Sequence, residues 1–185
     1  MLVKPFSGLS TTELYEILKA RFIVFYSEQN CRYLDMDDID YTATHIALFR
    51  QGQVIAYARL FQGDSPEEWH LGRMLTIERG RGFGRRIVTQ AEEYASSQGA
   101  KAVLLHAQTH AVPFYEKMGY TAYGPVFMEA DIPHVAMRKE LMNDGLSRSQ
   151  GELNDGMMND GMMNDGMMND GLRRSQGELN DEMMK

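Results

Sequence analysis

A nearly continuous apolar run, AVLLHA at 102–107, constrains the fold of this chain more than any other segment. A run without polar alternation is typical of a central strand that is buried on both faces of a sheet. An amphipathic helix is predicted before it, from the glycine-rich stretch 78–85 to Gln98. A short helix is predicted after it, from Pro113 to just before Gly119. The sequence therefore predicts a domain of the α/β class.

The remaining patterned segments predict a mixed sheet. Ser10 and Glu13 form a capping box before apolar residues at helical spacing, which predicts a helix over 11–27. Two apolar runs rich in strand formers flank Gln51-Gly52, and they predict a hairpin of strands 44–50 and 53–61. The polar stretch 27–40 is predicted to be mainly loop. Further strands are expected at 69–77, 120–130 and 135–141.

The last 43 residues have a different character. They hold eight of the 15 methionines and repeat MMNDG three times within 157–171. A five-residue period matches neither a helix nor a strand, so the methionine pairs cannot share one face. We predict a disordered, low-complexity tail at 143–185 and a folded domain at 1–142. A metal- or partner-binding tail is the alternative, although the repeats lack the alternating acidic ligands and terminal glutamate of a calcium loop.

Composition and charge exclude several classes of protein. The chain has 19 basic and 26 acidic residues, a net charge of −7, which argues against a nucleic-acid partner. No apolar run approaches the roughly 20 residues of a membrane span, and the N-terminus lacks the apolar region of a signal peptide. The single cysteine, Cys31, cannot form an internal disulfide. A cytoplasmic protein that binds neither nucleic acid nor membrane is expected.

A glycine-rich basic loop, RGRGFG at 79–84, joins a predicted strand to a predicted helix. Its glycines let the backbone approach a ligand closely, and the free N–H groups and dipole of the helix favour an anion. A phosphate or pyrophosphate site is predicted, against the alternative of a glycine turn with solvated arginines. A Walker loop does not fit, because Gly84 is followed by two arginines rather than by lysine and serine or threonine. A dinucleotide fold fits poorly, because the loop follows the third predicted strand and Lys101 opens the next one.

The segment R-x-x-G-x-G at 79–84 resembles the acyl-CoA pyrophosphate loop of the GCN5-related N-acetyltransferase (GNAT) family. The segment AVPFYEKMGY at 111–120 is similar to that family's second signature, A-x-x-F-Y-E-K-x-G-[FY], at the expected distance. The resemblance covers about residues 1–142 and implies a mixed, mostly antiparallel central sheet flanked by helices, with two splayed central strands. Shorter segments resemble the ElaA-like branch of the family: EQNC at 28–31, LGR at 71–73, HAQ at 106–108 and IPH at 132–134.

The resemblance implies acetyl-CoA as the co-substrate and no metal. Its pantetheine arm would lie between the splayed strands and pair with the backbone near Leu75, Thr76 and Ile77. A backbone N–H near Leu75 would polarise the thioester carbonyl. Arg85 or Arg86 would add charge-assisted contacts to the pyrophosphate. The pyrophosphate would lie on the N–H groups of Arg81, Gly82, Phe83, Gly84, Arg85 and Arg86.

The activity that the resemblance implies is transfer of an acetyl group to a primary amine by direct attack in a ternary complex. Tyr115 is the candidate acid for the leaving thiolate, and its alternative role is that of a packed core aromatic. The candidate bases are His134, His106 and Glu28. Cys31 has no evident activating partner and is not needed as a nucleophile. The acceptor would be a small-molecule or peptide amine, and a homodimer is expected by analogy with the family.

Two alternatives from other classes stay open: a non-catalytic acyl-CoA-binding module, and an interaction protein that works through its tail. The family resemblance places the segment after the first helix at the acceptor pocket. The four aspartates there are either part of a solvated loop or a field that attracts a cationic amine. Arg21 and Arg73 could instead hold an acceptor carboxylate. The aspartates are Asp35, Asp37, Asp38 and Asp40.

Overall fold

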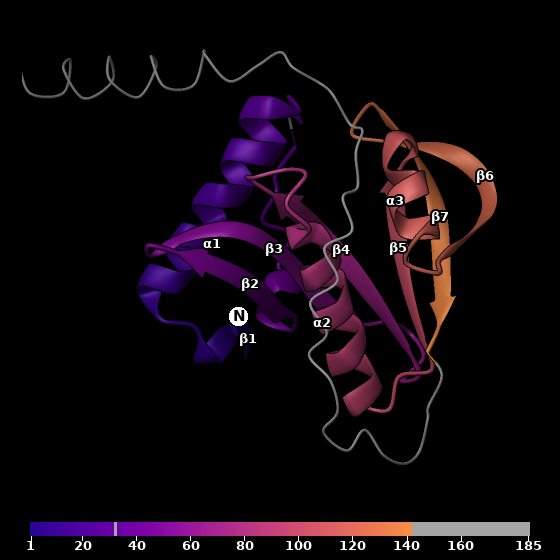
Figure 1. Cartoon of the computed structure of the whole chain (residues 1–185), viewed down its shortest axis with the longest axis horizontal. Coiled ribbons are helices and arrows are strands. Elements are labelled where there is room, and N and C mark those ends of the chain that lie inside the picture. The colour runs from indigo at the N-terminus through magenta and orange to yellow at the C-terminus, as the bar shows by residue number, and fades with distance from the viewer. Residues whose placement is uncertain (32, 142–185) are drawn as a thin grey trace, which may run out of the picture. The chain divides into compact units, whose positions relative to one another are not determined.

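The computed structural model describes residues 1–31 and 33–141, and the predicted tail at 143–185 lies outside these described residues. Seven strands and three α-helices make up the described chain, together with a π-helical turn, η2 (Phe22–Glu28), and short 3-10 turns (Figure 1). The helices are α1 (Thr11–Arg21), α2 (Phe83–Ser97) and α3 (Val112–Glu116). The strands are β1 (Leu2–Pro5), β2 (Thr44–Arg50), β3 (Gln53–Gln62), β4 (Glu68–Thr76), β5 (Ala102–Gln108), β6 (Thr121–Glu129) and β7 (Ile132–Glu140).

The first helix begins at the predicted capping box. Ser10 Oγ accepts a hydrogen bond from the Glu13 N–H at 3.2 Å, and Glu13 Oε2 accepts one from the Ser10 N–H at 2.8 Å. Both hydrogen bonds of the capping box are thus present, and they satisfy two N–H groups that have no partner within the helix. The α-helical turns end at Arg21, and the wider π-helical turn carries the chain on to Glu28. The predicted helix over 11–27 is confirmed in extent.

The strands form one mixed sheet in the order β1-β2-β3-β4-β5-β7-β6. Every neighbouring pair is antiparallel except β4 and β5, which run parallel. The predicted mixed, mostly antiparallel sheet is confirmed. The edge strand β1 was not predicted, because four residues are too few to show alternation. It pairs with β2 from Leu2 opposite Ala47 to Pro5 opposite Thr44.

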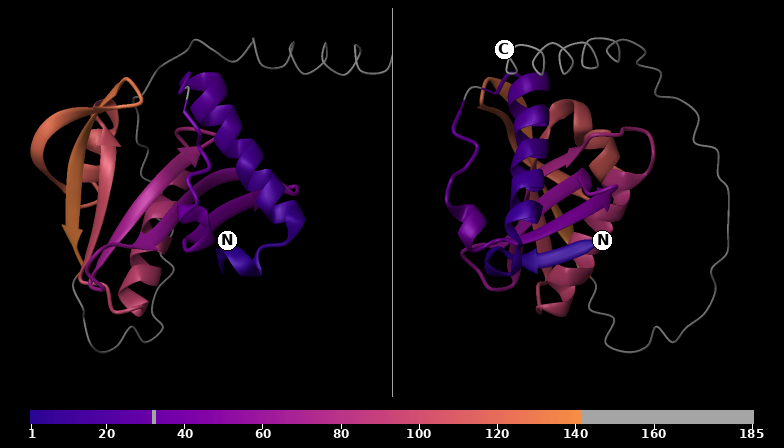
Figure 2. Two further views of the ribbon diagram at one scale, coloured as in Figure 1. Left: turned by 180° about the vertical axis from the view of Figure 1, so that it is seen from behind. Right: turned by 90° about the vertical axis from the view of Figure 1, so that its left-hand side faces the viewer.

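The central strands β4 and β5 separate along their length. They pair only where Glu68, Trp69 and His70 face Ala102, Val103 and Leu104. Beyond this short ladder the two ribbons diverge, as Figures 1 and 2 both show. The register of β4 on β3 shifts between Gly72 and Leu75, where Arg73 adopts a φ of 51°. A bulge of this kind bends a strand and increases its twist, which favours the divergence. The predicted splayed strands are confirmed.

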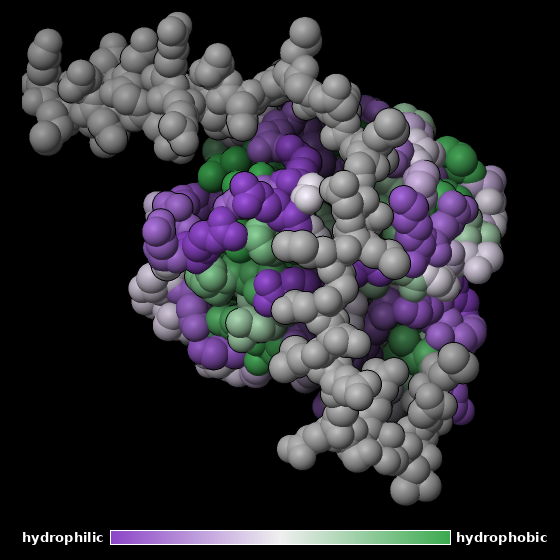
Figure 3. Space-filling view, viewed as in Figure 1, coloured by the Kyte–Doolittle hydropathy of each residue, from purple (hydrophilic) through white to green (hydrophobic). Residues whose placement is uncertain are grey.

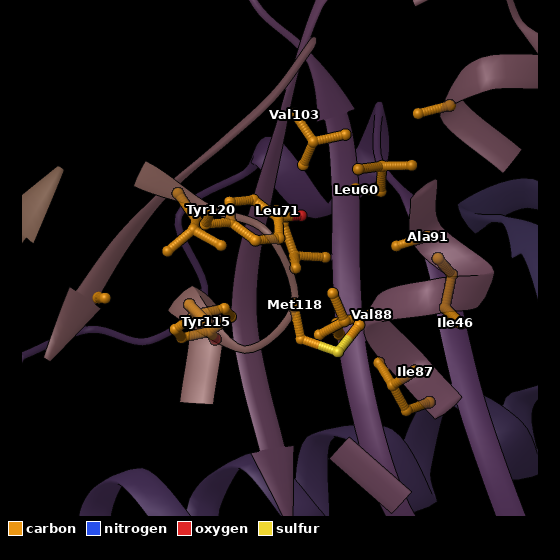
Figure 4. Packing of buried hydrophobic residues seen from close by; sticks show 14 of the residues in the cluster. Ile46, Leu60, Leu71, Ile87, Val88, Ala91, Val103, Tyr115, Met118 and Tyr120 are labelled. Carbon is orange, nitrogen blue, oxygen red and sulfur yellow. The ribbon is translucent and has the colours of Figure 1, made fainter. Parts of the chain in front are cut away.

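The sheet has a hydrophobic cluster on each face. On one face α2 packs through Val88, and the turn after α3 packs through Met118, on strand residues such as Leu60, Leu71 and Val103 (Figure 4). Each such fully buried aliphatic side chain contributes about 1.5–3 kcal/mol relative to an exposed one. On the other face, α1 and η2 cover β2, β3 and β4, as the right-hand view of Figure 2 shows. That second cluster contains Ile17, Val24, Ala47, Tyr57 and Leu75.

Within the described residues, no helix is long and apolar enough to cross a membrane. On the face seen in Figure 3, hydrophilic and hydrophobic residues are interspersed over the described surface. The same residues contain no group of three or more histidines, cysteines, aspartates or glutamates placed to hold a metal ion.

Candidate active site

The glycine loop leaves the start of α2 open. Gly80 and Gly82 each have a φ of 72°, a conformation that glycine adopts without steric cost, and Gly82 is the N-cap of α2. The Arg86 N–H donates to the Gly82 carbonyl at 3.2 Å, so the earlier N–H groups of this turn have no helical partner. A Cβ built on either glycine meets no other described atom within 4 Å. The space beside the two glycines is therefore open, next to the free backbone donors where the pyrophosphate was predicted.

The third glycine of the loop has a packing role. A Cβ built on Gly84 would lie 2.9 Å from Met74 Cε and 3.4 Å from Phe114 Cζ, so α2 approaches β4 and α3 closely at this point. Phe83, the first residue of α2, is buried in the cluster between α2 and the sheet. These contacts fix the start of α2 against β4, and thus fix the direction of the free N–H groups.

The arginines of the loop differ in their surroundings. Arg79 donates to Glu28 Oε2 at 2.5 Å, which ties the loop to the end of η2. Arg81, Arg85 and Arg86 have exposed side chains, and Arg81 makes only a long 3.8 Å ion pair with Glu78. Three cations thus remain at the open start of α2, where an anion would be stabilised by both charge and backbone donors.

The open edge of β4 presents the backbone of Thr76. The Ile77 N–H donates to the Ile55 carbonyl of β3 at 2.9 Å. Because the backbone groups of a strand point alternately to its two edges, those of Leu75 also face β3 and those of Thr76 face the gap towards β5. Of the three residues predicted to contact pantetheine, Thr76 therefore has the backbone orientation that such pairing requires.

Tyr115 lies on α3 and is 7% exposed. Its ring packs edge to face on Phe114 and Tyr120, with centroid distances of 5.0 and 5.7 Å. Burial raises the pKa of the Tyr115 hydroxyl, so the phenol keeps its proton at neutral pH. No described residue forms a hydrogen bond with that hydroxyl. Tyr115 therefore packs in the core, which was its alternative predicted role. Its hydroxyl also keeps a proton that it does not donate to any described residue.

The three candidate bases lie in different environments. His134, 8% exposed on β7, donates from Nδ1 to the Ile132 carbonyl at 2.8 Å, which leaves Nε2 of the neutral ring as an acceptor. His106 is exposed, and its Nδ1 lies 3.1 Å from Glu129 Oε2. The Glu28 carboxylate is paired with Arg79. His134 thus has the ring nitrogen best prepared to accept a proton, and it stands opposite Gln108 at the end of β5.

Cys31, which follows η2, is not activated. It is buried, and burial raises the pKa of its thiol, which disfavours the nucleophilic thiolate. The expectation that Cys31 is no nucleophile agrees with this environment.

A groove of about 590 Å³ opens at the wide end of the split. Gln108 of β5 donates from Nε2 to Gln29 Oε1 at 3.0 Å, and the Arg73 guanidinium of β4 lies 5.4 Å from the Tyr33 ring centroid. The diverging strands β4 and β5 therefore both contact the walls of this groove. The segment after the first helix, which the resemblance implies to form the acceptor pocket, lines this groove together with the β6–β7 turn, which was not expected to take part. The lining residues are Gln29, Asn30, Tyr33, Ala130, Asp131 and Ile132.

The aspartate-rich stretch after η2 forms a partly buried ion-pair network with three arginines. Arg21, 1% exposed, donates to Asp35 Oδ2 and to Asp40 Oδ1, both at 2.7 Å. Arg59 of β3 holds both carboxylate oxygens of Asp37, at 2.5 and 2.6 Å. The remaining arginine, Arg73 of β4, donates to Asp35 Oδ1 at 2.7 Å and to Asp37 Oδ2 at 3.1 Å.

These pairings overturn two expectations. The prediction of a solvated acidic loop is wrong for Asp35, Asp37 and Asp40, because an arginine binds each of these carboxylates. Their charge is neutralised locally, so they do not supply a net field that attracts a cation. The predicted role of Arg21 in holding an acceptor carboxylate is also wrong. Its side chain is inaccessible, and its guanidinium nitrogens already donate to Asp35 and Asp40. Arg59 was missed, because only the fold brings it beside Asp37.

The network lowers two carboxylate pKa values. Hydrogen bonds from Arg59 are the main cause for Asp37. Burial alone would raise the pKa of Asp40, but the hydrogen bond and charge of Arg21 outweigh it. A lowered native pKa gives stability that is present above the unfolded value, about 3.9, and is lost as pH falls towards the native value.

We therefore expect the contribution of this network to the free energy of unfolding to be nearly constant from about pH 7 to 5 and to fall below about pH 4. Burial lowers the pKa of His45 and His70, so these two side chains add a separate loss of stability between about pH 7 and 5. Urea unfolding of the full chain between pH 3 and 7 measures this dependence. The double variant Asp37→Asn, Asp40→Asn should be less stable at neutral pH and should lose less stability on acidification. Equal slopes for both chains would contradict the assignment of the acid sensitivity to this network.

Comparisons with known proteins match the same region. The family model described as an acetyltransferase (GNAT) domain matches residues 16–141. A UPF0039 protein from Schizosaccharomyces pombe is 36% identical over 143 residues, covering 75% of this chain and 95% of that protein. Protein ElaA from Escherichia coli is 34% identical over 142 residues, covering 74% of this chain and 93% of ElaA.

Two solved structures have a similar fold. The crystal structure of Escherichia coli ElaA has a TM-score of 0.70 at 33% identity and covers 75% of this chain and 97% of that one. The crystal structure of an acyl-CoA N-acyltransferase from Pseudomonas aeruginosa has a TM-score of 0.69 at 32% identity, with coverage of 75% and 97%. In both cases nearly the whole of the solved chain is matched.

Proposed function

Because the chain belongs to the GNAT family of acetyltransferases, we propose that it transfers an acetyl group from acetyl-CoA to a primary amine by direct attack in a ternary complex. The observation that carries this proposal is the open N-terminus of α2 beside the split between β4 and β5. Free N–H groups and exposed arginines suit a pyrophosphate, and the unpaired edge of β4 suits an extended amide-containing arm. Acyltransfer of this kind needs no metal.

The reaction forms a C–N bond and breaks the thioester C–S bond. The amine must be neutral when it attacks the carbonyl carbon, and it then loses a proton, for which His134 Nε2 is the best-placed acceptor. The leaving thiolate gains a proton, for which the buried Tyr115 phenol is the proposed donor. An N–H on the open edge of β4 would stabilise the developing oxyanion. We assign Glu28 mainly to holding Arg79, although it stays a candidate base.

We expect Tyr115→Phe to lower kcat about 100-fold while the Kd for acetyl-CoA changes less than about threefold, because only proton donation is lost. Steady-state kinetics and calorimetric titration measure the two effects. Tyr120→Phe is the matched control, since it removes a neighbouring buried hydroxyl, one that interacts with Glu92. Parallel losses of stability and activity in Tyr115→Phe would assign Tyr115 to the core alone.

The non-catalytic alternative makes a different prediction. A binding module would bind acetyl-CoA saturably and release no free CoA thiol with any amine of a broad panel. Deletion of residues 143–185 tests the interaction alternative: an enzyme keeps its turnover, whereas a protein that works through its tail loses its partner.

Two smaller proposals accompany the function. A cytoplasmic location is supported by the use of a single, buried cysteine, which requires no oxidising compartment. A homodimer is supported by the family resemblance only, and sedimentation of the full chain tests it.

A further inference from the structure

One carboxylate in the groove at the wide end of the split has no partner among residues 1–31 and 33–141. Among the described residues that line the groove, Asp131 is the only one with a charged side chain. It forms no ion pair or hydrogen bond with a described residue, unlike Asp35, Asp37 and Asp40 in the network nearby. Asp131 is exposed, and an exposed carboxylate without an ion-pair partner can pair with a cationic ligand.

The backbone places Asp131 firmly at the rim of the groove. Ala130 and Asp131 are the two central residues of the β6–β7 hairpin, between the paired residues Glu129 and Ile132. Their φ values are 52° and 62°, the left-handed conformation that a tight two-residue hairpin turn requires. The hydrogen bond from His134 Nδ1 to the Ile132 carbonyl fixes the same turn next to the candidate base.

The position of this turn relates the carboxylate to the reaction. Gln29 ties the groove to the end of β5, and Tyr33 ties it to the bulge of β4. A ligand in the groove therefore lies where the strands part, close to His134 and on the acceptor side of the split.

We propose, on the basis of the acyltransfer function above, that this groove holds the acceptor and that Asp131 selects an amine with a second positive charge, such as a linear diamine. One amine is neutral, loses its proton to His134 and forms the amide bond as the thioester bond breaks. The other amine stays an ammonium ion and pairs with the Asp131 carboxylate. Charge-assisted pairing of this kind distinguishes a diamine from a monoamine of equal length.

The test compares 1,5-diaminopentane with pentylamine as acceptors for the full chain at saturating acetyl-CoA. We expect kcat/KM to be about two- to fivefold higher for the diamine, because Asp131 is exposed and water screens the ion pair that it forms. Asp131→Asn should reduce this ratio to near one, chiefly by lowering kcat/KM for the diamine. Asparagine also suits the turn, so folding should be retained. Asp64→Asn, the same change in the exposed turn after β3, should leave the ratio unchanged.

A second measurement separates this inference from the proposed function. If both amines are acetylated equally, or if Asp131→Asn keeps the preference, the role of Asp131 is overturned and the acetyltransferase function stands. If neither amine is acetylated, calorimetric titration of 1,5-diaminopentane into the CoA-saturated chain decides. Binding that Asp131→Asn abolishes supports the diamine site even without turnover, and absent or unchanged binding overturns it.

Discussion

The Gly82→Glu chain is expected to lose acetyl-CoA binding, with an affinity at least about 1000-fold lower than that of the unchanged chain. Gly82 is the N-cap of α2, and open space lies above it. A glutamate there would place a side chain and a negative charge over the free N–H groups. Loss of two or three charge-assisted hydrogen bonds, each contributing about 1.5–3 kcal/mol, accounts for the size of the effect.

Gly52→Glu provides the matched control for this experiment. Gly52 lies in the β2–β3 turn with a φ of 81°, and a Cβ there also meets nothing within 4 Å. The same substitution in a similar backbone conformation should therefore impose a similar strain but leave the affinity unchanged. Calorimetric titration of both variants measures the difference. A folded Gly82→Glu chain that binds acetyl-CoA within threefold of the unchanged chain would remove the pyrophosphate assignment.

The second large effect concerns stability. Arg21→Ala should lower the free energy of unfolding by about 3–5 kcal/mol, the usual effect of removing one partner of a buried ion pair. Asp40 would keep only the 3.2 Å contact with Arg59, and Asp35 would keep Arg73. The cost arises chiefly because a buried carboxylate is left without sufficient compensation.

Lys19→Ala is the control on the same helix. Lys19 pairs with Glu16 at 2.8 Å near the surface, and such a pair contributes about 0.5 kcal/mol or less. Urea unfolding of both variants at neutral pH gives the comparison. Equal, small effects for Arg21→Ala and Lys19→Ala would contradict the view that the arginine–aspartate network fastens the segment after η2 to the sheet.

Sequence patterns located the parts of the fold that depend on local interactions. The capping box at Ser10, the hairpin at Gln51-Gly52 and the amphipathic pattern of α2 each depend on residues that are close in the chain. The loop before α2 was located for the same reason. Gly80 and Gly82 have the open, left-handed conformations that a ligand loop needs, whereas Gly84 is required by its contacts with Met74 and Phe114.

Features that depend on distant residues were missed or misjudged. The pairing of Asp35 with Arg73 joins residues 38 positions apart, so the sequence predicts only a solvated loop or a field that attracts a cation for the aspartate-rich stretch. The bulge at Arg73 and the turn at Ala130 and Asp131 place non-glycine residues at positive φ. Their residue types give little local signal for that conformation, because the surrounding sheet imposes it. The groove walls and the arginine–aspartate network depend on these features.

Calorimetric titration of the full chain with acetyl-CoA tests the central claim most directly. The account predicts saturable binding at one site per chain, competed by free CoA and lost in Gly82→Glu. Absence of binding by a chain that circular dichroism shows to be folded would contradict the assignment of the α2 N-terminus and the β4–β5 split as an acyl-CoA site.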